Sequence, residues 1–155
     1  MGAGIRRFLD LTEEGELLPY AGILKEEAAQ LGLGVHWQRL PIPDVSVPSP
    51  VRMAEIQAAI SDALGWGEPL YVHCWGGGGR TGTVVGCYLV ESGLSGREAL
   101  QRLGELWRCV EKRYRKPRSP ETTEQEQSVL SWTPTVRSAG GTRPAVDRYA
   151  GCLLV

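Results

Sequence analysis

The sequence predicts a single α/β domain in which a central, mostly parallel sheet is flanked by helices. Two observations support this fold class. Three short apolar segments, 5–9, 35–40 and 69–73, alternate with longer segments whose apolar residues recur at helical spacing. The third short segment continues through a glycine-rich loop into residues 80–92, which are apolar on nearly every side and therefore indicate a buried helix. Strands that are separated by helices pair in parallel, because the connecting chain must cross the face of the sheet.

Two helices with recognisable ends connect the three predicted strands. Residues 21–31 carry apolar side chains at helical spacing and are followed by Gly32, a residue type that commonly ends helices. The second helix is predicted to begin after Ser49, because this N-cap residue precedes a proline at the first helical position, and to end at Gly65. The two helices supply the crossover connections that a parallel sheet requires.

Two more helices are predicted after the buried one. Residues 95–98 form a capping box, Ser-Gly-Arg-Glu, that starts a helix with an apolar face extending to Val110. The pair Ser119-Pro120 has the residue types of a helix start, and the helix that follows is predicted to end near Trp132. The sheet is therefore predicted to be flanked by helices from both halves of the chain.

Residues 1–132 are predicted to form the folded domain, and residues 133–155 a flexible C-terminal tail. The tail contains Gly, Pro, Ser, Thr and Arg with little hydrophobic periodicity. It ends in Cys152-Leu-Leu-Val, which fits the pattern for prenylation, although so short a pattern is easily matched by chance. A lipid anchor, a chance match and a remnant of cloning or of a shifted reading frame are the alternatives.

A basic segment forms the predicted end of the helix that begins with the capping box. Cations near the C-terminus of a helix are stabilised by the helix dipole, which is the ordinary structural explanation for such residues. The alternative is a surface that receives an acidic or phosphorylated substrate. The cations concerned are Arg108, Lys112, Arg113, Arg115, Lys116 and Arg118.

The overall composition limits the classes of partner. The 155 residues carry a formal net charge of −1, so no general attraction to nucleic acid or to membranes is expected. No segment is long and apolar enough to span a bilayer, and no signal peptide is recognisable. The four cysteines show no CxxC pair and no disulfide-like spacing, which favours a reducing compartment. We expect a cytoplasmic, monomeric protein.

The loop that joins the third strand to the buried helix has the chemistry of a phosphate-binding site. Glycines let successive N–H groups point inward, toward an anion at the N-terminus of the following helix. The helix dipole and the guanidinium of Arg80 both favour the thiolate form of Cys74. Arg80 offers two donors to two phosphate oxygens, and Thr81 places a hydroxyl near Cys74. Between Cys74 and Arg80 stand five residues, Trp75, Gly76, Gly77, Gly78 and Gly79.

Two familiar glycine-rich motifs do not fit this loop. Nucleotide-binding P-loops require a lysine that is absent here, and dinucleotide-binding loops require a downstream acidic residue for which there is no convincing candidate. The loop instead resembles the active-site signature of cysteine-dependent protein tyrosine and dual-specificity phosphatases: His-Cys, five residues, Arg-Thr. The resemblance covers roughly residues 5–132. The positions that fall on the signature are His73, Cys74, Gly76, Gly79, Arg80, Thr81 and Gly82.

The resemblance implies a phosphoprotein phosphatase that hydrolyses phosphotyrosine, and by extension phosphoserine and phosphothreonine, without a metal or another cofactor. Cys74 is implied to be the nucleophile that forms a phosphocysteine. Arg80 and the N–H groups of residues 75–80 are implied to hold the phosphate. Thr81 is implied to help the thiolate leave, and His73 to order the loop through hydrogen bonds.

Asp44 is implied to be the general acid. It follows Pro41-Ile42-Pro43, which keeps the chain extended and stiff, and it precedes Cys74 by 30 residues. Dual-specificity phosphatases place a general-acid aspartate on a loop about that far before the cysteine. A turn aspartate without a catalytic function is the ordinary explanation, and Asp10, at the end of the first strand, is a rival acid.

A glutamine near the start of the last helix is implied to position the attacking water. The Ser-Pro-Glu-Thr…Glu-Gln stretch is similar to the segment in which some small phosphatases of this family carry such a glutamine. Gln125 fits this place best, and Gln127 is the alternative. A solvated glutamine without a catalytic role is the ordinary explanation.

Several functions stay open at this point. One is a catalytically inactive phosphate-binding module of the same fold, although Cys74, Arg80 and Asp44 are all present. Another is a phosphatase of phosphoinositides or other phosphomonoesters. Phosphoinositide enzymes that resemble this loop carry lysines in it, where Trp75 and glycines stand here. Arsenate reductases and sulfur transferases also use cysteine loops, but they do not need the Pro-Ile-Pro-Asp element. The sequence therefore favours a phosphoprotein phosphatase.

Overall fold

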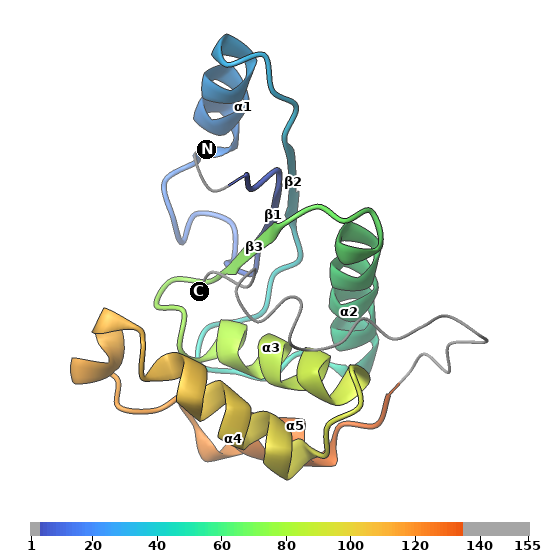
Figure 1. Ribbon diagram of the computed structural model, residues 1–155. Helices are drawn as coiled ribbons and strands as arrows, with labels where there is room; N and C mark the ends of the chain where they lie inside the picture. Colours follow the sequence, from blue (N-terminus) through green and yellow to red (C-terminus); the bar gives the residue numbers. More distant parts are fainter. Residues whose placement is uncertain (1–3, 135–155) are drawn as a thin grey trace.

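A computed structural model describes residues 4–134 and shows a parallel sheet with helices around it (Figure 1). The strands are β1 (Arg7–Asp10), β2 (His36–Arg39) and β3 (Leu70–His73), and they lie in the order β2-β1-β3. β1 pairs in parallel with both neighbours. The predicted α/β class and the parallel centre of the sheet are confirmed. Almost all of the predicted tail, with Cys152, lies outside the described residues.

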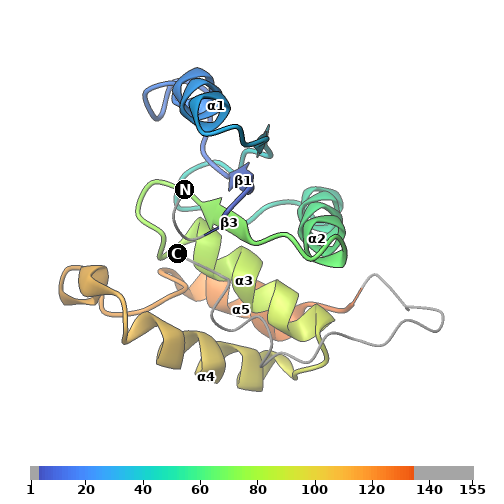
Figure 2. The same cartoon turned by 45° about the horizontal axis from the view of Figure 1, so that its top comes forward.

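Five α-helices and one short 3-10 helix occupy the described part of the chain. Figures 1 and 2 show α1 at one end of the molecule, the sheet in the middle and α3, α4 and α5 together at the other end. No helix among residues 4–134 is long and apolar enough to cross a membrane. The helices are α1 (Ala21–Gln30), α2 (Pro50–Gly65), α3 (Arg80–Glu91), α4 (Gly96–Trp107), η1 (Glu111–Tyr114) and α5 (Thr123–Ser131).

Two predicted helix boundaries are wrong. α4 ends at Trp107 rather than near Val110, because the chain turns back and the Trp107 indole N–H donates to the Lys116 carbonyl at 2.8 Å. Most of the basic segment therefore lies in turns and in η1, beyond the last turn of α4. α5 begins after Thr122 rather than at Ser119-Pro120, because Thr122 forms a capping box with the residue three positions later.

The helix that carries the glycine-rich loop is enclosed, as its composition predicts. Every residue of α3 from Arg80 to Val90 is buried, and its side chains pack on α2, α4 and α5. Gly86 allows α5 to approach closely, since a Cβ atom there would lie only 2.7 Å from Cγ2 of Val129. This packing holds the N-terminus of α3 in a fixed position relative to the sheet.

The parallel arrangement brings three loops to the same edge of the sheet. Asp10 is opposite both Arg39 and His73, so β1, β2 and β3 end side by side. The segments that follow them contain Glu16, Asp44 and the cysteine loop. The carboxyl ends of parallel strands are where open α/β sheets bind ligands, so this edge is where a site is expected.

Candidate active site

The cysteine loop is folded around the sulfur of Cys74. Cys74 directly follows β3 and is 7% exposed, and the N–H of Gly77 donates to its Sγ at 3.3 Å. This turn requires a φ of +79° at Gly77, a conformation that favours glycine. The sulfur thus has a backbone N–H directed at it, and the same loop leads into the N-terminus of α3.

Arg80 opens α3, and its guanidinium is buried among acceptors. Nη1 donates to Oε2 of Glu16 at 2.7 Å and to the carbonyl of Ile42 at 3.1 Å. Nη2 contacts Oε1 of Glu16, and Oδ1 of Asp44 lies 2.9 Å from the same nitrogen. The hydrogen bonds from Arg80 hold the pKa of Glu16 below its ordinary value, and Glu16 raises the pKa of Arg80. The cation at this site is therefore permanent and firmly oriented.

The structure brings Asp44, and not Asp10, to the cysteine loop. The Asp44 side chain is 67% exposed and lines the same pocket as Cys74 and Arg80. Asp10 is fully buried, where it accepts hydrogen bonds from Thr12 and pairs with Arg39 at 3.2 Å. Asp10 is thus a structural carboxylate at the end of β1. Asp44 has the exposure and position that a general acid needs, and its role stays a prediction.

His73 connects the sheet to the loop through hydrogen bonds. One ring nitrogen, Nδ1, lies 3.3 Å from the Cys74 carbonyl oxygen. The other, Nε2, forms a hydrogen bond with the hydroxyl of Tyr20. Burial raises the pKa of Tyr20 to about 12, so this phenol keeps its proton. The contacts are of the kind that the predicted loop-ordering role of His73 requires. Sequence analysis did not identify Tyr20.

A small pocket opens above the sulfur. Three of the five loop residues predicted to bind phosphate line it, whereas Gly77 and Gly78 do not. Thr81 faces a different small cavity, and its buried hydroxyl has no hydrogen-bond partner among residues 4–134. The role predicted for Thr81 therefore stays a prediction that this geometry does not by itself support. The pocket residues are Asp44, Val45, Cys74, Trp75, Gly76, Gly79, Arg80, Lys116, Glu121 and Gln125.

Gln125 reaches the pocket but is engaged in structural hydrogen bonds. Its Oε1 accepts from the backbone N–H groups of Glu121 and Thr122, at 3.1 and 3.2 Å. Its Nε2 donates to the Ser46 carbonyl at 3.1 Å and so ties α5 to the loop that carries Asp44. The Gln125 side chain is fully buried, and its role in positioning water stays a prediction. The alternative, Gln127, is exposed and does not line the pocket.

Residues 107–121 support the loop from behind and supply a cation to its rim. The Ser119 hydroxyl donates to the Gly78 carbonyl at 2.8 Å, and a Cβ at Gly78 would lie 3.3 Å from the ring of Trp107. Lys116 Nζ would lie 3.2 Å from a Cβ at Gly76, and it pairs with Glu121 at 2.9 Å. The basic composition of the segment was the available signal for Lys116. Glu16 had no signal, because it lies in an ordinary polar turn.

The comparison with known proteins agrees with this geometry. A family model described as "PTP-SAK: Swiss Army Knife protein, DSP-PTPase phosphatase domain" matches residues 1–129. The chain belongs to this family of dual-specificity-type protein tyrosine phosphatases. The phosphatase family and the α/β phosphatase fold predicted from the cysteine signature are thereby confirmed.

Individual relatives give the same assignment. This chain resembles the crystal structure of Tk-PTP in its active form, with a sequence identity of 31% and a TM-score of 0.66. The match covers 82% of this chain and 77% of the Tk-PTP chain. The "Putative tyrosine phosphatase 067L" of Invertebrate iridescent virus 3 is 36% identical over 92 residues, which are 56% of this chain and 35% of the viral protein. The kinase-associated phosphatase KAP, at 21% identity and a TM-score of 0.62, covers 83% of this chain and 68% of its own and shows the shared fold.

The mouse protein tyrosine phosphatase domain-containing protein 1 is 29% identical over 97 residues, 58% of this chain and 13% of the mouse protein. This chain therefore spans only about a third or less of the curated relatives that it matches. What those longer proteins do as a whole does not transfer to it directly.

Proposed function

We propose that this phosphatase hydrolyses phosphotyrosine in proteins, and also phosphoserine and phosphothreonine, through a phosphocysteine intermediate. The observation that carries the proposal is one pocket lined by Cys74, Arg80 and Asp44, with the loop N–H of Gly77 directed at the cysteine sulfur. A nucleophile, an anion-binding cation and a proton donor are the three groups that this reaction needs.

The first step forms a bond between sulfur and phosphorus. The substrate phosphate settles on the loop N–H groups and on Arg80, and the Cys74 thiolate attacks phosphorus in line. The bond from phosphorus to the substrate oxygen breaks, and protonated Asp44 gives its proton to that oxygen. Arg80 and the loop stabilise the equatorial oxygens, which is the main electrostatic contribution to the rate.

The second step restores the enzyme. Water attacks the phosphocysteine, Asp44 takes a proton from that water, and the phosphorus–sulfur bond breaks to release inorganic phosphate and the thiolate. Gln125, which belongs to α5, donates to the Ser46 carbonyl of the loop that carries Asp44, and we assign its remaining N–H to orient the water. Arg80 must exchange its contact with Asp44 for a phosphate oxygen before either step, because both of its terminal nitrogens are already engaged.

A phosphoinositide phosphatase is the second candidate, and one observation favours it. Lys116 brings to the pocket a cation that the loop sequence itself lacks, next to Gly76. That charge is offset by Glu121, whose two carboxylate oxygens each lie 2.9 Å from Nζ. A pocket with a neutralised lysine suits a singly phosphorylated side chain better than a headgroup with several phosphates, so phosphoprotein is the proposed substrate class.

The test is hydrolysis of para-nitrophenyl phosphate, of phosphotyrosine and phosphothreonine peptides, and of soluble phosphoinositides, without metal and with a reductant. The wild type is compared with Cys74→Ser and, as a matched control, with Cys109→Ser, which changes an exposed cysteine outside the pocket. We expect loss of turnover in Cys74→Ser only, with peptides preferred over phosphoinositides. Turnover retained in Cys74→Ser would refute the mechanism, and faster phosphoinositide hydrolysis would refute the substrate class.

A further inference from the structure

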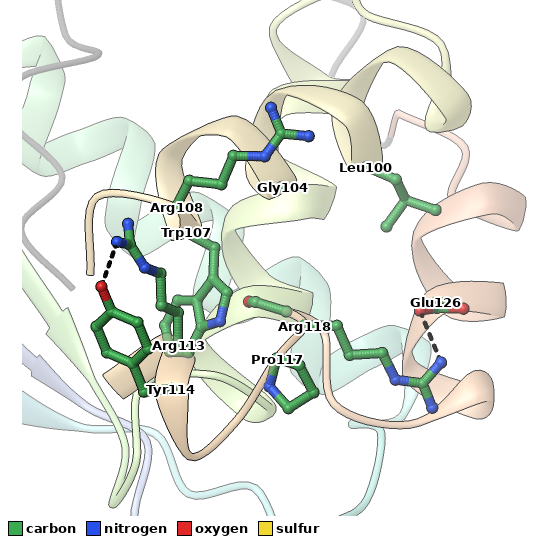
Figure 3. Close-up of a pocket in the computed structure, with 10 residues that line it drawn as sticks. Leu100, Gly104, Trp107, Arg108, Arg113, Tyr114, Pro117, Arg118 and Glu126 are labelled. Atoms are coloured by element: carbon green, nitrogen blue, oxygen red, sulfur yellow. Dashed lines mark hydrogen bonds and ion pairs between the residues drawn. The ribbon is translucent and has the colours of Figure 1, made fainter. Parts of the chain in front are cut away.

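A second and larger cavity, of about 490 Å³, is lined in part by the two residues that directly follow Lys116 of the candidate active site. Figure 3 shows the residues that line it. Its walls come from the C-terminal half of α4, from the basic segment that follows and from α5. Figure 3 shows Trp107 and Pro117 between an Arg113–Tyr114 pair and an Arg118–Glu126 pair. We call it the basic groove and define it by Trp107, Arg108, Arg113, Tyr114, Pro117 and Arg118.

The basic groove concentrates positive charge in a chain that is nearly neutral. Residues 108–118 hold six of the 17 Lys and Arg residues and a single carboxylate, Glu111, whereas the whole chain has a net charge of −1. No carboxylate among residues 4–134 forms an ion pair with Arg108 or Arg113. Arg118 pairs with Glu126 at 3.3 Å, which leaves the groove with two uncompensated cations.

A helix dipole explains Arg108 but not Arg113 or Arg118. α4 ends at Trp107, so Arg108 caps it, but Arg113 and Arg118 lie beyond its last turn, where the dipole has little effect. Arg113 lies 4.7 Å from the Tyr114 ring centre and donates to its hydroxyl at 2.7 Å, and Tyr114 itself is 78% exposed. Tyrosine and arginine are both residue types that are enriched at protein interfaces.

The groove and the small pocket above Cys74 are formed by neighbouring stretches of the chain, although no residue lines both. Lys116 lines the pocket, and the next two residues, Pro117 and Arg118, line the groove. Trp107 forms part of the groove, and its ring also packs against Gly78 of the cysteine loop. An extended peptide advances about 3.3 Å per residue. A chain whose phosphate lies on the loop therefore reaches the groove within a few residues.

We propose that the basic groove binds acidic side chains of the substrate close to its phosphorylated residue. The inference rests on the proposed phosphoprotein phosphatase function and adds a sequence preference to it. Separate carboxylates fit the groove better than a continuous anionic surface does, because Glu126 lies among the arginines and repels a broad negative face. The arginines would steer acidic substrates to the pocket, most strongly at low salt.

Binding is tested first with peptides that carry no phosphate. A labelled peptide with four glutamates is compared with its four-glutamine counterpart by fluorescence anisotropy. The variant is the pair Arg108→Gln and Arg113→Gln, and the matched control is Arg97→Gln, an exposed arginine in the first turn of α4. We expect the wild type to bind the glutamate peptide about tenfold more tightly, and the double variant, but not the control, to lose most of that difference.

Hydrolysis is tested next with a phosphotyrosine peptide flanked by glutamates or by glutamines. We expect kcat/KM of the wild type to favour the acidic peptide about fivefold to tenfold, and the double variant to cut this ratio to about two. Equal kcat/KM for both peptides in the wild type would refute the proposed binding of acidic side chains by the groove, but it would leave the phosphatase function intact. If neither peptide is hydrolysed but the glutamate peptide binds, the groove is supported and the function refuted. Binding to phosphatidylserine vesicles without a peptide preference would overturn the proposal in favour of a membrane surface.

Discussion

Replacement of Asp44 by alanine should change anion binding and turnover in opposite directions. In the structure Oδ1 of Asp44 lies 2.9 Å from Nη2 of Arg80, where a phosphate oxygen would bind. The other contacts of the guanidinium, to Glu16 and to the Ile42 carbonyl, do not involve Asp44 and are expected to remain in the variant. Removal of the carboxylate thus frees a donor and also removes the proposed acid.

The size of the binding effect follows from the exposure of the ion pair. Because the Asp44 side chain is 67% exposed, the pair is worth about 0.2–1 kcal/mol, the range of solvent-exposed pairs. Losing this competition should therefore tighten binding of an oxyanion by up to about fivefold. Loss of a general acid typically lowers the rate by about 10²–10⁴, so turnover should fall far more than binding improves.

The assay combines inhibition and leaving-group dependence. The inhibition constant of inorganic phosphate should decrease in Asp44→Ala, and kcat should fall much more for phenyl phosphate than for para-nitrophenyl phosphate, whose leaving group needs less help from a proton. Glu55→Ala is the matched control, because Glu55 also pairs with an arginine, at 2.7 Å, but on the exposed face of α2. Weaker phosphate binding would refute the competition between Asp44 and phosphate for Arg80. An equal loss of kcat for both esters would show that Asp44 is not the acid.

Three further predictions follow from the contacts around the loop. Glu16→Gln should destabilise the fold by about 2 kcal/mol and lower kcat/KM, because the guanidinium of Arg80 loses a charged acceptor; chemical denaturation and kinetics check this. Arg80 lowers the pKa of Glu16 in the folded state. The stability that the ionised Glu16 gives to the fold is therefore complete above the ordinary pKa of a glutamate, and it is lost as the pH falls through the lowered value. The difference in melting temperature between wild type and Glu16→Gln should therefore shrink below about pH 4.5. Gly82→Ala should destabilise the fold by about 1–3 kcal/mol, because the new Cβ would lie 2.1 Å from the Ser119 hydroxyl oxygen. Adding Ser119→Ala should restore part of the lost stability. Gly104→Ala, where there is open space around the new Cβ, should leave the stability undiminished.

The cysteine loop could be predicted because its information is local. A strand, a nucleophile, glycines, an arginine and a helix follow one another without interruption, so their spacing alone places Cys74 and Arg80 on one anion site. Asp44 needed the family resemblance as well, since an aspartate after two prolines is by itself an ordinary turn residue. The order of the three strands then determines that the two loops meet.

Glu16 could not be predicted, because nothing in its own neighbourhood distinguishes it. It lies in a polar turn together with other acidic residues, and its partner Arg80 is 64 residues away along the chain. Only the pairing of β1 beside β3 brings the two together. A buried guanidinium requires acceptors, but nothing in the sequence shows which residues supply them.

The early end of α4, which the sequence pattern did not predict, bears on function. Cys109 and Val110 continue the apolar pattern of the helix, and periodicity alone cannot show that the chain has already left it. What ends the helix is a contact, from the Trp107 indole to the Lys116 carbonyl, that depends on the chain turning back. Had α4 continued, its dipole would account for the cations and they would project along one helix. Because it stops, Lys116 is carried to the rim of the pocket and the arginines surround a groove. The same turn thus makes the basic segment a candidate for substrate selection rather than for helix stability.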